Sequence, residues 1–100
     1  MILRTWHGRT PASKADAYLE LMRTSALPAY KAVPGCLGAW VTRRIDGDVA
    51  HFETISLWSD LAAIEGFAGK PVETAKYDDF DRDFLLELEP TVRHVEAWDA

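Results

Sequence analysis

The sequence has little cysteine, little basic charge and no long hydrophobic run, and each shortage excludes a class of protein. Cys36 is the only cysteine, which excludes an intrachain disulfide and a cysteine-based zinc site and fits a reducing compartment. With 11 Lys and Arg against 16 Asp and Glu, the net charge is −5, which disfavours nucleic acid as a partner. Neither a signal region nor an apolar run near the ~20 residues of a membrane span is present. We therefore expect a cytoplasmic protein with no membrane partner.

The aromatic content, by contrast, is high for the length of the chain. Residues 1–100 are predicted to form one domain, because no linker composition or change of charge divides them. A domain of this size buries only roughly two-thirds of its unfolded surface. Four Trp, four Phe and three Tyr are more aromatic surface than such a chain hides easily. A partner subunit is therefore expected.

The stretch from residue 52 to residue 68 has the clearest pattern. β-branched and aromatic residues up to Trp58 predict a strand. Ser59 or Asp60 then caps a helix whose apolar residues recur every three or four positions through Phe67. A strand that ends in Trp and turns at once into a helix places a flat side chain at the mouth of the space between them.

The N-terminal third predicts a strand followed by a helix. Residues 2–7 form the strand, and a turn then leads to Thr10 as helix N-cap and Pro11 as first helical residue. Because Pro28 lacks a backbone N–H, the helix is expected to end or kink at Leu27 and to resume briefly through Tyr30. One helical face is marked by Ala15, Tyr18, Leu19, Met22 and Ala26.

A hairpin is predicted over residues 36–58, with Asp46 and Gly47 as a two-residue type I′ turn and Ile45 paired with Asp48. This register defines two faces. Both are partly apolar, so one is expected to be covered by helices and the other by a second copy of the sheet. The first face carries Leu37, Ala39, Val41, Arg43, Ala50, Phe52, Thr54, Ser56 and Trp58. The second carries Gly38, Trp40, Thr42, Arg44, Val49, His51, Glu53, Ile55 and Leu57.

The C-terminal third predicts a short acidic helix over residues 78–88, with Phe80, Phe84, Leu85 and Leu88 inward, and a last strand over residues 91–98. The run of acidic residues is interpreted as a solvated face. The element order β-α-β-β-α-β predicts the fold class α+β. The specific prediction is a ferredoxin-like sandwich, in which an antiparallel four-stranded sheet has helices on one face.

Four segments together resemble the antibiotic biosynthesis monooxygenase-like domains of the dimeric α+β barrel superfamily. They are Pro34–Ala39 before the second strand, Ile55–Ser59 before the second main helix, Phe67–Gly69, and Phe84–His94 at the end. The resemblance implies a homodimer whose two sheets pack into a barrel, with a pocket between sheet and helices in each subunit.

The resemblance also implies a function. Characterised relatives oxidise aromatic polyketides to quinones with molecular oxygen, without metal or flavin, so this chain would be a cofactor-independent monooxygenase of a small phenol- or quinol-like ligand. Others cleave haem with an Asn on the first strand and a Trp and a His further on. Counting from Trp58, those last two positions fall on Phe67 and Tyr77, and the first strand has no Asn. A non-catalytic ligand-binding or stress-associated homodimer, and a haem-binding or haem-degrading protein, remain the alternatives.

Three residues are candidates for moving a substrate proton: His7, His51 and Tyr77. Each histidine, like His94, is equally explained as a half-buried strand residue with a hydrogen-bond partner. Tyr77 follows a Gly-Lys-Pro break and is placed on a lid, where its hydroxyl holds a substrate oxygen or packs against the acidic helix. No His-x-His pair or histidine–carboxylate cluster is evident, so no metal site is predicted. The family resemblance implies that no cofactor is used.

The candidate pocket residues come from the second main helix and from both faces of the hairpin, and each is alternatively a core or surface residue. They are Trp58, Phe52, Phe67, Trp40 and Arg43. On the second face, Arg44 and Glu53 are interpreted more simply as an interface or interstrand ion pair than as substrate-orienting groups.

Overall fold

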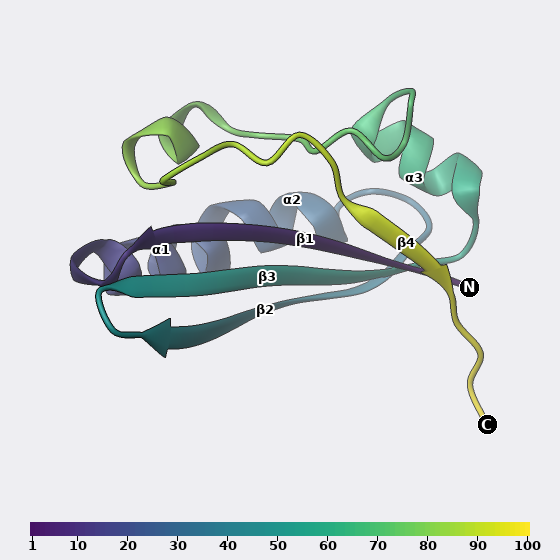
Figure 1. Cartoon of the computed structure of the whole chain (residues 1–100). Helices are drawn as coiled ribbons and strands as arrows, with labels where there is room; N and C mark the ends of the chain where they lie inside the picture. The colour runs from purple at the N-terminus through teal and green to yellow at the C-terminus, as the bar shows by residue number, and fades with distance from the viewer.

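The computed structural model describes residues 1–100 as an antiparallel four-stranded sheet with helices on one side (Figure 1). The strands, in the spatial order β2-β3-β1-β4, are β1 Ile2–Pro11, β2 Cys36–Asp46, β3 Val49–Trp58 and β4 Arg93–Glu96. The helices are α1 Ala15–Leu21, α2 Leu27–Lys31 and α3 Leu61–Ala68, with 3₁₀ turns at Ala12–Lys14 and Asp79–Asp83. This is the predicted ferredoxin-like α+β fold. None of the helices is both long and apolar enough to span a lipid bilayer.

The first strand is longer than predicted. Residues 8–11, expected to be a turn, continue the ladder with β3, where Gly8 faces Phe52 and Pro11 faces Val49. Thr10, expected to cap the helix, is a fully buried strand residue whose hydroxyl donates to the Pro11 carbonyl. The strand continues because β3 is long enough to pair with all four residues. This pairing outweighs the local preference of residues 8–11 for a turn.

The first helix becomes irregular just before Leu27 and then resumes for a short stretch, as predicted, with α2 over Leu27–Lys31. The turn Met22–Ala26 is π-helical, and the Leu27 amide donates to the Met22 carbonyl five residues back. Pro28 then lies in the first turn of α2. Because the π-turn already breaks the regular i−4 ladder, the N–H that proline lacks is not required there. The predicted inward face is correct: its buried members are Ala15, Tyr18, Met22 and Ala26.

The hairpin turn lies one residue later than predicted. Asp46 pairs with Val49 and Ile45 with Ala50, so the Ile45–Asp48 pairing was wrong by two residues along β3. Gly47, at φ +60°, adopts the left-handed conformation that favours glycine in such a turn. Since side chains alternate with a period of two, a slip of two residues keeps both predicted faces.

The two faces of the sheet differ in how they are covered. On β3 the residues facing the helices are all buried, and Phe52 and Trp58 are fully so. The opposite face leaves Trp40 52% exposed and Val95 57% exposed. The core therefore lies between the sheet and the helical layer, and the other face carries uncovered apolar surface.

The C-terminal third has less regular structure than predicted. The expected helix over residues 78–88 is only the 3₁₀ turn Asp79–Asp83, and the last strand is four residues long. The Leu86 amide donates to the Arg9 carbonyl and the Val92 amide to the Glu73 carbonyl, so this backbone pairs with distant segments instead of with itself. Phe80, Phe84 and Leu85 do pack against the core, as predicted, whereas Leu88 is exposed.

Candidate functional site

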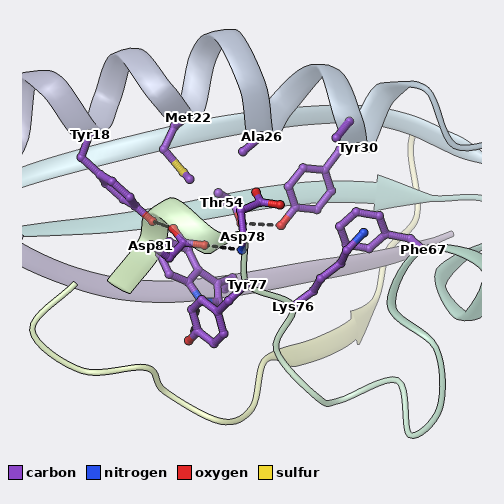
Figure 2. A pocket seen from close by; sticks show the side chains of 12 residues that line it. Tyr18, Met22, Ala26, Tyr30, Thr54, Phe67, Lys76, Tyr77, Asp78 and Asp81 are labelled. Carbon is purple, nitrogen blue, oxygen red and sulfur yellow. Dashed lines mark hydrogen bonds between the residues drawn. The ribbon is translucent and has the colours of Figure 1, made fainter. Parts of the chain in front are cut away.

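A small cavity lies between the helical layer and the sheet, and the segment from residue 76 to residue 81 closes it (Figure 2). Its volume is about 40 Å³, which is room for roughly three water molecules. A flat aromatic ligand therefore fits only when the closing segment moves outward. The lining residues are Trp6, Tyr18, Met22, Ala26, Ala29, Tyr30, Thr54, Phe67, Lys76, Tyr77, Asp78 and Asp81.

Local structure explains why these side chains converge. Tyr18, Met22 and Ala26 recur every four residues along the helix and so share its inward face. Trp6 and Thr54 are direct neighbours across β1 and β3 and form the floor. The cavity thus has rigid elements on two sides and a loop on the third.

One wall of the cavity is a stack of aromatic rings. Tyr30 and Phe67 are stacked with centroids 4.5 Å apart, and the Trp58 ring lies 5.5 Å behind Phe67. Trp58 is 0% exposed, and its indole N–H donates to Ser56 Oγ at 2.8 Å. Trp58 therefore supports the cavity wall from behind, while Phe67 lines the cavity itself.

Two tyrosine hydroxyls at the cavity are already hydrogen-bonded within the chain. Tyr77 accepts from the Trp6 indole N–H and donates to the Glu89 carbonyl. Tyr30 and Thr54 share a hydrogen bond of 3.1 Å. Burial raises the pKa of both Tyr30 and Tyr77, so both remain neutral phenols that can donate a proton in a hydrogen bond but do not act as bases.

Asp81 is the buried acidic group of the cavity. It is 4% exposed and accepts hydrogen bonds from the Tyr18 hydroxyl and the Asp78 amide, each at 2.7 Å. Burial nevertheless raises its pKa, because desolvation outweighs these two hydrogen bonds. A carboxylate made more basic in this way is suited to accept a proton from a ligand.

The sequence reasoning missed Asp81 because it read the whole acidic run as solvated. The signal was Tyr18, an inward-facing residue whose hydroxyl needs a buried partner. That partner lies 63 residues away in the chain.

The stretch of chain that leads into the closing segment is attached to the sheet by Arg4. Its guanidinium donates to the carbonyls of Val72 and Thr74, at 2.6 and 3.2 Å, and lies 3.0 Å from His94 Nε2. For this last contact, His94 must be neutral and accept through Nε2. The attachment therefore depends on the protonation state of His94.

We expect acid to loosen this segment. Burial and the Arg4 charge lower the pKa of His94, so the folded protein binds that proton less readily than the unfolded chain does. The stabilisation is complete above about pH 6.5 and is lost as the pH falls through the lowered pKa. Limited proteolysis within residues 69–92 should accelerate on acidification, and His94→Gln, which cannot ionise, should remove that acceleration. An unchanged pH dependence in the variant would contradict this assignment.

His7 and His51 lie on the opposite face of the sheet, away from the cavity. His7 Nε2 is 3.1 Å from His51 Nδ1, and His7 Nδ1 is 2.7 Å from a carboxylate oxygen of Glu89. The expectation that no histidine–carboxylate cluster forms was wrong, because Glu89 is 82 residues from His7 in the chain and no spacing reveals the contact. A catalytic role for either histidine stays a prediction.

Most of the predicted pocket residues do not line the cavity. Phe52 is buried in the core edge-to-face with Tyr18 at 5.0 Å. Arg43 forms an ion pair with Asp16 at 2.7 Å, and Trp40 lies on the opposite face. Phe67 is the predicted residue that does line it, as does Tyr77 among the proposed catalytic groups.

The interstrand ion pair predicted between Arg44 and Glu53 does not form within the chain, and a pair across an interface stays a prediction. Arg44 lies 3.6 Å from Asp46 on its own strand. Glu53 faces Thr42 across the hairpin and Arg44 faces His51, so the two residues are diagonal neighbours and are not directly opposite each other.

No protein-family model and no curated protein sequence matches this chain. Solved structures do match it over nearly its whole length. A proposed antibiotic biosynthesis monooxygenase from Deinococcus radiodurans is 18% identical with a TM-score of 0.69, and the match covers 100% of this chain and 95% of that one. A similar protein from Nitrosomonas europaea is 13% identical with a TM-score of 0.65, covering 95% and 94%.

A third neighbour is the haem degrader MhuD from Mycobacterium tuberculosis, in a structure with two haems in its active site. It is 16% identical with a TM-score of 0.62, and the match covers 100% of this chain and 99% of MhuD. At these identities the likeness concerns the fold. The chain therefore shares the fold of the antibiotic biosynthesis monooxygenases, in agreement with the resemblance found in its sequence.

Proposed function

We propose that this chain, which has the fold of the antibiotic biosynthesis monooxygenases, oxidises a small phenol- or quinol-like compound with molecular oxygen and without a cofactor. The observation that carries the proposal is Asp81, a buried carboxylate of raised pKa within a cavity walled by aromatic rings. Apolar walls with a few convergent polar groups and a perturbed pKa are the usual features of a site for a small organic ligand.

The proposed reaction begins with proton transfer. The closing segment moves out, the ring enters against Tyr30 and Phe67, and closure excludes water. Asp81 accepts the phenolic proton, and the electron-rich phenolate then reduces oxygen directly. One oxygen atom bonds to an unsubstituted ring carbon ortho or para to the hydroxyl and the other leaves as water, so a phenol and O₂ give a quinone and water. The protein supplies orientation and a proton acceptor.

Oxygen uptake by the purified protein tests this function. A panel of phenols, hydroquinones and anthrones is incubated with protein in chelator-treated buffer, under oxygen-18 gas. The proposal predicts protein-dependent uptake, with one labelled oxygen atom in each quinone formed from a phenol or an anthrone. A hydroquinone already carries both oxygen atoms and would give an unlabelled quinone and hydrogen peroxide. Binding of the same compounds without any uptake would contradict the proposal and favour a non-catalytic ligand-binding dimer.

We also propose that the chain forms a homodimer through the uncovered face of its sheet. Trp40 and Val95 are about half exposed there, and Leu3, Ile55 and Leu57 point to the same side. A sheet with an uncovered apolar face is typical of a surface that another subunit covers.

Trp40→Glu should convert this dimer to a monomer, because it places a charge at the centre of a dry contact. Light scattering after size-exclusion chromatography measures the mass. The matched control is Leu61→Glu, an equally exposed apolar residue on α3, which should leave the dimer intact. A wild-type protein that is monomeric at high concentration would contradict the proposal.

A further inference from the structure

Two positive side chains flank Phe67 at one end of the cavity, and neither has a carboxylate partner. Lys76 Nζ lies 4.5 Å from the centroid of the Phe67 ring, and the guanidinium carbon of Arg4 lies 5.8 Å from it. The ion pairs of the chain involve other residues. Both cations therefore contribute uncompensated positive charge at this end.

The Arg4 charge is unusual because it is buried. Arg4 is 2% exposed, all its hydrogen-bond partners are uncharged, and its Nε has no partner. A buried guanidinium without a counter-charge is costly, and burial lowers the pKa of Arg4 accordingly. An anion bound nearby would offset part of that cost.

The other end of the cavity carries negative charge. Asp81 lies beside Tyr18, on the side opposite to Lys76 and Phe67, and Asp78 lies between Asp81 and Tyr30 (Figure 2). The ring of Tyr30, stacked on Phe67, lies on the side of Lys76. The cavity thus has an acidic end at Asp81, with Asp78 toward its middle, and a basic end at Lys76.

We propose that the ligand is an aromatic acid, a phenol whose ring carries a carboxylate. The carboxylate binds Lys76 at the basic end and the hydroxyl faces Asp81 at the acidic end. Lys76 is exposed and on the segment that closes the cavity, so a bound carboxylate would also hold that segment closed. The placement of the ligand hydroxyl at Asp81 rests on the proposed function. The contact between the carboxylate and Lys76 does not depend on any reaction.

Charge selects this ligand over others with the same ring. A neutral phenol gains nothing from Lys76, and an aromatic amine would bring a positive charge to two cations that are already uncompensated. The order of affinity expected from the cavity is therefore carboxylate, then amide, then amine.

Calorimetric titration without oxygen tests the proposal with 4-hydroxybenzoate, 4-hydroxybenzamide and tyramine. The benzoate should bind about tenfold more tightly than the amide, as expected for a charge-assisted hydrogen bond. Lys76→Met, which keeps an apolar stem over Phe67, should remove that difference by weakening the benzoate alone. Lys70→Met is the control, because Lys70 lies outside the cavity, 3.5 Å from Glu65.

Three results would overturn the proposal: equal affinity for benzoate and amide, equal weakening of both by Lys76→Met, or no benzoate binding at millimolar concentration. Oxygen uptake with neutral phenols would in that case leave the proposed function standing. Conversely, selective benzoate binding without oxygen uptake on any phenol would support the aromatic-acid site and contradict the proposed oxygenase activity.

Discussion

Replacing Asp81 by asparagine should lower protein-dependent oxygen uptake by about 10²–10⁴-fold, the range that a positioned general base contributes. Asparagine has the same shape, and its amide oxygen can still accept the Tyr18 hydroxyl. It cannot take a proton from the substrate. The turnover number at saturating phenol measures the loss, and circular dichroism during heating checks that the variant is folded.

The pH profile gives this prediction a second readout. Because burial raises the pKa of Asp81, the wild-type rate should rise with pH through a midpoint above the usual aspartate value of about 3.9. Asp79→Asn, an exposed neighbour in the same turn, should keep both rate and profile. A folded Asp81→Asn protein with full activity would contradict the role of Asp81. If His7→Ala or His51→Ala also lost activity, the active site would lie on the opposite face of the sheet.

Trp58→Ala should destabilise the protein by about 3–5 kcal/mol, as expected for truncating a fully buried aromatic residue. That is a large part of the roughly 5–15 kcal/mol that holds a small domain together. The indole is 0% exposed, supports Tyr30 and Phe67, and satisfies Ser56 Oγ. Urea unfolding followed by circular dichroism measures the change in the free energy of unfolding.

Trp98 provides the matched control for this experiment. It is 81% exposed, on the terminal stretch that extends away from the sheet (Figure 1). Trp98→Ala should change stability by less than about 0.5 kcal/mol. Similar effects of the two substitutions would show that the stack behind Phe67 does not stabilise the fold as the packing indicates.

The periodic spacing of apolar residues was enough to predict the sheet faces and the inward side of the first helix. Alternation along β3 placed Phe52 and Trp58 on the same face even though the hairpin register was wrong. The spacing from Ala15 to Ala26 marked the buried side of the helix. Both patterns are local, and each depends only on the geometry of one element.

The candidate site could not be predicted in the same way, because its polar contacts join distant segments. Asp81 belongs to a run of acidic residues, and only the contact with Tyr18 distinguishes it from its neighbours. Likewise, Leu86 leaves the predicted helix because its amide donates to the Arg9 carbonyl. Residue type singled out the histidines and Tyr77, whereas burial, which depends on tertiary packing, singles out Asp81.

The most direct test of where the ligand binds is a two-dimensional amide NMR titration of nitrogen-15-labelled protein with a phenol in the absence of oxygen. The account predicts the largest shifts for residues 76–81 and around Tyr30, with little change in the imidazole signals of His7 and His51. Shifts confined to those imidazoles, with the amides of residues 76–81 unmoved, would contradict it and place the ligand on the opposite face of the sheet.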